Sequence, residues 1–171
     1  MCQVIDNLND KVIPELPKLP KNTNLYSLHI EKRILSDECK NNEVPHFIAV
    51  EEEFIEQLKN HEIFATHEYI DALSWDMYAI ATPPQGNFPV RVDFYIYALT
   101  KKSVDEIKDI IKTHFPSFSI IKVREELCEK MYEYHKKNDI KFEHTEFFEV
   151  SLYVKRINEC IKGMNDWNQN H

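Results

Sequence analysis

The chain of 171 residues is long enough for one domain with a sizeable core, and 43% hydrophobic with 29% charged residues is the composition of a folded protein. Glycine occurs only at Gly86 and Gly163, where average usage would give roughly 12 residues. Loops that hold nucleotide phosphates need several glycines close together. The composition therefore excludes P-loop and dinucleotide-binding proteins.

The chain is acidic, because 29 Asp and Glu residues against 21 Lys and Arg residues give a formal net charge of −8. Arginine, the usual reader of phosphates and base edges, occurs only at positions 33, 91, 124 and 156. Repulsion from phosphate opposes contacts between an acidic surface and DNA or RNA. This balance disfavours direct nucleic-acid binding and favours a basic protein partner.

The cysteines are scattered, at positions 2, 39, 128 and 160, and no CxxC or Cys/His cluster typical of a zinc site occurs. The first residues lack the apolar segment of a signal peptide. No apolar run approaches the ~18 residues that a membrane span needs. We therefore expect a cytoplasmic protein with reduced thiols and with no cofactor, metal centre or membrane contact.

Residues 1–43 are predicted to form an extended arm and a first secondary-structure element. The three prolines of PELPKLP have the spacing of a polyproline II arm. We expect Leu16 and Leu19 to pack on the chain's own domain, and the alternative is a ligand for an aromatic-lined groove of another protein. Residues 25–35 fit a strand and a helix equally well.

Residues 44–70 predict a strand, a helix and a second strand. The apolar run VPHFIAV (44–50) suits a buried strand. A helix follows from Glu51, and three successive glutamates in its first turn would complement the helix dipole. Residues 63–70 fit a strand.

A β-hairpin is predicted between residues 74 and 99. Strand 74–82 leads into the turn PPQGN (83–87), and strand 89–99 has the clearest alternation in the chain. One face of strand 89–99 is apolar: Val90, Val92, Phe94, Ile96 and Ala98. The other face carries Arg91, Asp93, Tyr95 and Tyr97.

The remaining elements alternate between helix and strand. Ser103 and Glu106 form a capping box at the start of a helix that ends before Pro116. The predicted elements after it are strand 117–123, helix 124–137, a long strand within 140–155 and helix 156–167. In the long strand we expect Phe148, Val150, Leu152 and Val154 to face inward.

Residues 44–123 therefore follow the order βαββαβ, which is the ferredoxin-like plan. In this plan helices cover one face of an antiparallel sheet. We predict an α+β fold in which residues 44–171 form a single domain. It consists of this core and a C-terminal α-β-α extension over 124–171, and an extended N-terminal arm precedes it.

The polar face of the hairpin is the best candidate site. If the turn is tight, six residues share this face: Asp76, Tyr78, Arg91, Asp93, Tyr95 and Tyr97. Tyrosine and arginine are enriched at binding hot spots. We predict a non-enzymatic, acidic binding protein of immunity-protein or inhibitor type, acting on a basic or nucleic-acid-handling protein. The alternative is a half-buried face that lies beneath the arm or the C-terminal elements.

Two enzymatic hypotheses use other features. Asp76 and Asp93, with Glu143 or Glu149, would bind Mg²⁺ in a metal-dependent phosphodiester hydrolase. Tyr134-His135-Lys136-Lys137 fits the YxxK pattern of rolling-circle replication nucleases. Their histidine pair has only the poor substitute His29-Ile30-Glu31 here, so we interpret Tyr134 as a core residue of its helix.

Overall fold

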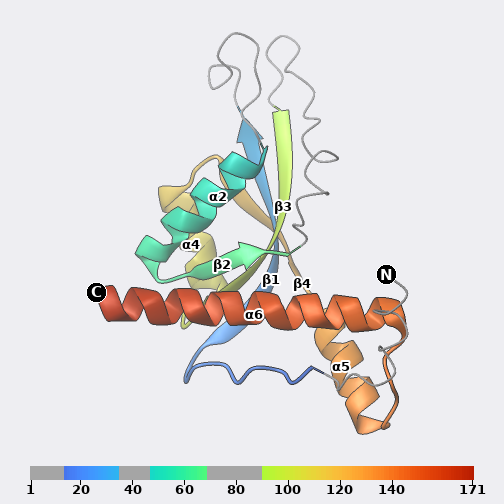
Figure 1. Ribbon diagram of the computed structural model, residues 1–171. Helices are drawn as coiled ribbons and strands as arrows, with labels where there is room; N and C mark the ends of the chain where they lie inside the picture. Colours follow the sequence, from blue (N-terminus) through green and yellow to red (C-terminus); the bar gives the residue numbers. More distant parts are fainter. Residues whose placement is uncertain (1–13, 35–46, 69–89) are drawn as a thin grey trace.

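The computed structural model describes residues 14–34, 47–68 and 90–171 as an α+β fold (Figure 1). Its antiparallel sheet has the strand order β2-β3-β1-β4. The elements in chain order are β1 (Asn24–Ile34), α2 (Phe47–Leu58), the 3₁₀ helix η4 (Lys59–His61), β2 (Phe64–His67), β3 (Val90–Thr100), α4 (Val104–His114), β4 (Phe118–Arg124), α5 (Leu127–Lys137) and α6 (His144–Asn170).

β1 is a central strand of the sheet. It pairs with β3 over its whole length and with β4 on its other side. Leu28 and Ile30 are buried on one face, and Ser27 and Glu31 are buried on the other. The sequence left residues 25–35 undecided because burial on both faces weakens the polar alternation that identifies a half-buried strand.

The strong hairpin strand is confirmed as β3, and residues 63–70 contain the short strand β2. β2 and β3 pair antiparallel, with Phe64 opposite Leu99 and His67 opposite Ile96. The predicted strand 74–82 and turn 83–87 lie outside the described residues.

Helices α2 and α4 cover the first face of the sheet, on the same side in Figure 1. Residues from these helices, from η4's end and from alternate strand positions form one apolar cluster: Leu28, Ile30, Phe54, Ile55, Leu58, Ile63, Val92, Phe94, Ile96, Ala98, Ile107, Ile111 and Phe115. The predicted inward positions of β3 are confirmed from Val92 to Ala98. This cluster holds the sheet and both helices together.

The predicted strand 44–50 is wrong, because α2 begins at Phe47. A short apolar run cannot by itself distinguish a buried strand from a buried helix. The early start also moves the glutamates out of the first turn. Glu51 is instead buried in the middle of α2, 3.0 Å from Nδ1 of His67 on β2.

The capping box at α4 is confirmed. Ser103 Oγ accepts a hydrogen bond from the Glu106 backbone N–H at 3.2 Å, and the Glu106 carboxylate accepts one from the Ser103 N–H at 3.1 Å. Strand β4 follows as predicted, with a register shift where it passes His29 and Ile30. The local signals of this region were sufficient because capping is a contact between near neighbours.

The long strand predicted within residues 140–155 is wrong, because α6 is one continuous helix from His144. The C-terminal extension is therefore α5 followed by α6. The alternating apolar residues from Phe148 to Val154 suggested a strand, but neither Gly nor Pro interrupts residues 144–162. The buried apolar positions of α6 recur every three or four residues: Val150, Tyr153, Ile157, Cys160 and Met164.

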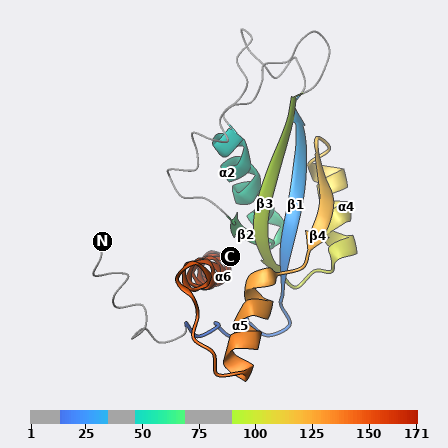
Figure 2. The ribbon, with the colours of Figure 1, turned by 90° about the vertical axis from the view of Figure 1, so that its right-hand side faces the viewer.

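Helix α6 crosses the lower end of the sheet in Figure 1, and Figure 2 shows it end-on beside the second face. It packs with Phe64, Tyr97 and Leu99 in a second apolar cluster. The expected packing of the N-terminal arm is confirmed, since Leu16 and Leu19 lie against this cluster. Among the described residues, no helix is long and apolar enough to cross a membrane.

Candidate functional site

The second face of the sheet contains the predicted site residues that the structure describes. Asp93 and Tyr95 are half-buried there. Arg91 pairs through its backbone with Arg33, and its side chain lies outside the described part. Asp76 and Tyr78 also lie outside it, so their predicted place beside β3 stays a prediction.

Tyr97 lies in the packed part of this face. It is 3% exposed, and its ring meets that of Tyr153 on α6 edge-on, with ring centroids 5.4 Å apart. At Tyr97 and Leu99, near the end of β3, the face lies beneath the C-terminal helix, as the alternative interpretation expects. Both side chains belong to the second apolar cluster. Tyr97 is therefore enclosed almost entirely by the protein's own residues, and its role in partner binding stays a prediction.

Asp93 and Tyr95 both contact His29 from the neighbouring strand β1. Nε2 of His29 lies 2.9 Å from Oδ1 of Asp93. The imidazole also stacks on the Tyr95 ring, with ring centroids 4.7 Å apart. The β1–β3 register places His29 directly opposite Tyr95, so cross-strand pairing accounts for this contact.

Arg124, at the end of β4, joins this polar group through Tyr95. Its guanidinium lies 4.8 Å from the centre of the Tyr95 ring, donates a hydrogen bond of 2.9 Å to Oγ of Ser27 and forms an ion pair with Glu68. Burial lowers the pKa of Arg124, and the negative charge of Glu126 partly opposes this effect. The arginine is thus engaged on several sides by groups of the chain itself.

A pocket of about 330 Å³ opens beside Arg124, between the sheet and helices α5 and α6. The volume is at the lower end of the range for ligand sites. Its lining comes from the sheet, from the start of α5 and from one face of α6: Ser27, Glu68, Tyr97, Arg124, Glu125, Glu126, Leu127, Cys128, Glu149, Leu152 and Tyr153. Four glutamates line it against a single arginine.

Glu126 sits at the inner side of this pocket. It is the N-cap residue of α5, and its carboxylate accepts a hydrogen bond of 3.0 Å from the backbone N–H of Cys128. The Tyr97 hydroxyl also donates to Glu126. A side-chain cap and a tyrosine therefore fix one carboxylate of the pocket in place.

Burial and nearby carboxylates both disfavour negative charge on three side chains at the pocket. Burial, and then the charges of Glu126 and other glutamates, raise the pKa of Cys128 to about 12 and raise the pKa values of Tyr97 and Tyr153 above the ordinary value. A carboxylate disfavours any further negative charge beside it. The same field stabilises a cation.

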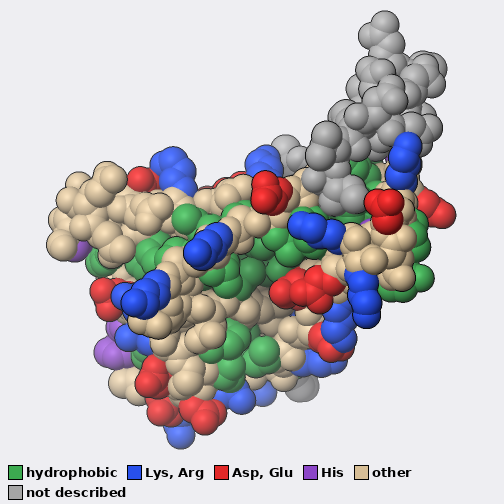
Figure 3. Space-filling model, turned by 90° about the horizontal axis from the view of Figure 1, so that it is seen from below, with side chains coloured by type: hydrophobic (Ala, Val, Ile, Leu, Met, Phe, Trp, Pro, Cys, Tyr) green, Lys and Arg blue, Asp and Glu red, His purple; other side chains and the backbone are tan. Residues whose placement is uncertain are grey.

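Exposed apolar side chains lie at the mouth of the pocket and along α6. Leu127 is 71% exposed, Phe148 46% and Leu152 36%. Leu127 and Leu152 are part of the pocket lining. The view from below in Figure 3 shows hydrophobic side chains along one face of the molecule, with acidic and basic side chains around them.

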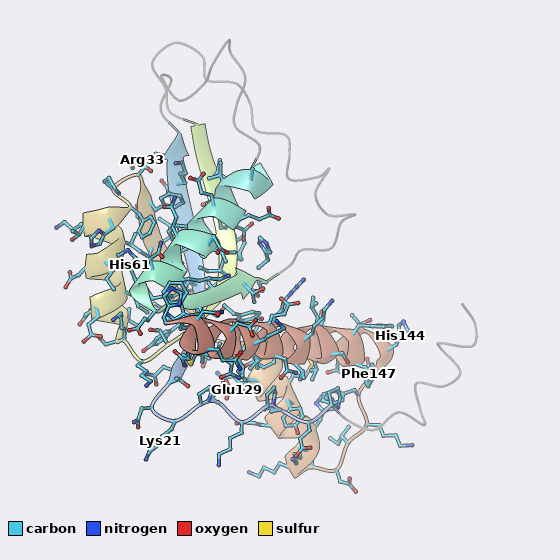
Figure 4. All side chains as sticks on the ribbon, turned by 60° about the vertical axis from the view of Figure 1, so that its left-hand side comes forward. Lys21, Arg33, His61, Glu129, His144 and Phe147 are labelled. Atoms are coloured by element: carbon cyan, nitrogen blue, oxygen red, sulfur yellow. The ribbon has the colours of Figure 1, made fainter. Side chains whose placement is uncertain are left out.

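A second pocket, of about 270 Å³, lies between the N-terminal arm and helices α5 and α6. Glu129 of α5 lies on its wall, together with Leu16, Leu19 and Tyr153. Figure 4 shows Glu129 beneath α6, with His144 and Phe147 further along at the N-terminal end of that helix. The arm thus borders the acidic region without entering the first pocket's lining.

The structure gives the enzymatic hypotheses different outcomes. Within residues 14–34, 47–68 and 90–171, no group of three or more His, Cys, Asp or Glu side chains could hold a metal ion. The Asp76–Asp93 pairing stays a prediction, because Asp76 lies outside these ranges. The interpretation of Tyr134 as a core residue is wrong, since it is 60% exposed and Tyr132 and His135 are the buried residues of α5.

Sequence reasoning placed Asp93 and Tyr95 together on one face of β3, but it did not identify the residues around them. His29 had no signal, because its segment was undecided between strand and helix. Glu68, Arg124 and Glu126 stand at or beyond the ends of strands β2 and β4, where no periodic pattern marks them. Leu152 was placed on the inner face of a strand that does not exist.

Comparison with protein-family models, curated proteins and solved structures gives no match.

Proposed function

We propose that the chain is a non-enzymatic cytoplasmic binding protein, of immunity-protein or inhibitor type, that acts by contact with a basic or nucleic-acid-handling protein. The observation that carries the proposal is the pocket beside Arg124, where four glutamates and one engaged arginine surround about 330 Å³. A lysine or arginine side chain of the partner is the expected occupant, because its charged head and apolar stem match these walls.

The wall chemistry supports this occupant. Tyr97, Leu127, Leu152 and Tyr153 supply apolar or aromatic surface for the stem. Glu126 supplies a fixed acceptor, and the more exposed acids at the rim, such as Glu149, add long-range attraction. Charges arranged in this way increase the rate of association with an oppositely charged protein and discriminate against acidic ones.

A net charge of −8 supports a protein rather than a nucleic acid as the direct partner. An inhibitor of a nucleic-acid-handling protein would occupy the basic surface that this protein presents to its own substrate. Such competition needs no catalytic group on the inhibitor, which is consistent with a site built from glutamates and tyrosines.

We also propose that the sheet and helices from β1 to β4 form a ferredoxin-like core whose first strand is β1 rather than residues 44–50. The succession β1, α2, β2, β3, α4, β4 supports this assignment. A split βαβ unit requires β3 between β1 and β2, and β1 between β3 and β4, which is consistent with the order β2-β3-β1-β4.

The experiment is charge reversal at the pocket rim. The double variant Glu125→Lys/Glu149→Lys replaces two exposed carboxylates of the lining. Nuclear magnetic resonance titration with N-acetyl-lysine amide should shift the backbone amides of Cys128 and Leu152 in the wild-type chain. We expect the double variant to lose these shifts.

The matched control is Glu52→Lys/Glu53→Lys, which makes the same charge change at two exposed positions of α2, away from the pocket. It should titrate like the wild type. N-acetyl-glutamate amide should leave the Cys128 amide unmoved. If the lysine probe does not shift the pocket amides of the wild-type chain, the proposed function is wrong.

A further inference from the structure

An apolar row on α5 and α6 extends the acidic pocket along the surface. Phe148 and Leu152 are four residues apart on α6, so they lie on one side of the helix, about 6 Å apart along its axis. Leu127 stands with Leu152 in the pocket lining. We call these three exposed residues, Leu127, Phe148 and Leu152, the apolar row.

The row lies where α5 and α6 are held together. The Sγ atom of Cys128 contacts the backbone oxygen of Glu149 at 3.8 Å, so the start of α5 touches α6 between Phe148 and Leu152. At the other end of α5, buried His135 lies 3.4 Å from Oε1 of Glu146 and stacks on Phe142 at 4.5 Å between ring centroids. Contacts at both ends keep the two helices in a fixed relation.

Acidic side chains border the row. Glu125 and Glu126 precede Leu127, and Glu149 lies between Phe148 and Leu152 in sequence. Lys130 forms an ion pair with Glu125, which leaves Glu126 and Glu149 as the carboxylates beside the row that carry no lysine partner within the described ion pairs. An apolar row with acidic borders is complementary to a surface that is apolar along one line and basic beside it.

Backbone geometry decides which kind of segment fits. The row stands on two helices whose backbone groups are paired internally, so it offers no strand edge to an extended peptide. A partner segment buried on this row loses the water that hydrogen-bonds to its backbone. Its backbone N–H and C=O groups must then pair within the segment, as they do in a helix. Apolar side chains three or four residues apart on such a helix would lie along the row.

We propose that the apolar row binds a basic amphipathic helix of the partner, with one of its lysine or arginine side chains entering the pocket beside Arg124. The apolar face of the partner helix covers Leu127, Phe148 and Leu152, and its basic side chains meet Glu126 and Glu149. This inference rests on the proposed function, because it names the form in which the basic partner presents its cation.

The test uses a fluorescein-labelled peptide of leucine and lysine with helical periodicity, about 14 residues long so that it can form a helix. A scrambled peptide of the same composition has the same charge without an apolar face. Fluorescence anisotropy with the full chain measures both affinities, and circular dichroism measures helix formation. We expect the periodic peptide to bind at least tenfold more tightly and to become helical on binding.

Substitutions in the row separate its contribution from that of charge. Phe148→Ser and Leu152→Ser should each weaken binding of the periodic peptide about tenfold, and binding of the scrambled peptide should hardly change. Because both side chains are at least 36% exposed, these variants should melt close to the wild type. Val104→Ser, a partly buried position on α4, is the control for a lost apolar side chain elsewhere.

The outcomes distinguish the two proposals. Equal binding of both peptides, unaffected by Phe148→Ser but lost in Glu125→Lys/Glu149→Lys, overturns the helix inference and leaves the acidic pocket intact. Failure of both cationic peptides to bind overturns the helix inference and the proposed function together. Preference for the periodic peptide that disappears in Phe148→Ser and Leu152→Ser supports the inference.

Discussion

The two faces of the sheet differ in how the side chains of β3 are buried. On the first face Val92, Phe94 and Ile96 are buried beneath α2 and α4. On the second face Asp93 and Tyr95 remain partly accessible and make polar and aromatic contacts. One strand thus supplies both the main core and the candidate site, because successive side chains point to opposite faces.

The difference follows from how much of each face the helices cover. α2 and α4 lie along the first face, and α6 crosses only the lower end of the sheet (Figure 1). Where α6 packs, the second face is apolar, as at Phe64 and Leu99. Beyond it, the described side chains are polar and satisfied by pairing, as in His29–Asp93 and Arg124–Glu68. The pocket beside Arg124 therefore lies at the edge of the area that α6 covers on the second face.

The sharpest test of this comparison removes adjacent rings from β3. Phe94→Ala should lower the free energy of unfolding by about 3–5 kcal/mol, because it leaves a cavity in the first-face cluster. Tyr95→Ala, on the half-open face, should cost about 1 kcal/mol through the lost contacts with His29 and Arg124. Urea unfolding followed by circular dichroism measures both. Similar losses for the two variants would contradict the division into a core face and a site face.

A smaller change of opposite sign concerns α6 on the second face. Gly163→Ala should raise the free energy of unfolding by about 0.5–1 kcal/mol, because alanine favours the helix. The new Cβ would meet its nearest side chain, Phe64, at an ordinary contact distance of 4.0 Å. Thermal melting measures the gain. A lower melting temperature would mean that the new Cβ clashes with Phe64, so that α6 lies closer to the sheet than 4.0 Å allows.

The smallest expected effect is a pH dependence at the edge of the first face. The rings of His61 and His114 are tilted against each other, with ring centroids 4.5 Å apart. Burial first, then the charges of His114 and Lys102, lower the pKa of His61 below 6.5. The unfolded chain therefore binds a proton at a higher pH than the folded chain, and this contribution to stability is complete above pH 6.5 and decreases as the pH falls below it.

The measurement compares the urea midpoints of the wild type and His61→Gln between pH 7.5 and pH 5. The wild type should lose slightly more stability than the variant as the pH falls. Parallel pH profiles for the two proteins would show that folding does not lower the pKa of His61. His114→Gln is the matched control for the second ring, and it should reduce the wild-type pH dependence without reversing its sign.

Local signals in the sequence predicted the elements that such signals can define. Apolar and polar residues alternate strictly along β3, and Ser103 and Glu106 form the capping box at the start of α4. The packing of Leu16 and Leu19 on the chain itself also followed from the arm's composition. Within the site, Asp93 and Tyr95 were predicted because their face is set by the alternation of β3.

Elements defined by their neighbours were missed. The run before Glu51 reads equally as strand or helix, and only packing of Phe54, Ile55 and Leu58 against the sheet decides for α2. The alternation from Phe148 to Val154 matches a strand locally. Packing of Tyr153 and Ile157 on the second face requires a helix instead. Short apolar runs leave that choice to tertiary contacts.

The sequence by itself determined an acidic, glycine-poor chain and the two faces of β3, because charge and alternation are local properties. Only the tertiary structure decided that β1 lies at the centre of the sheet, that α6 is one helix and that Arg124, Glu126 and Leu152 border one pocket. These residues come from separate elements, and contacts between distant segments place them side by side. The residue pattern within a single segment cannot predict contacts with distant segments.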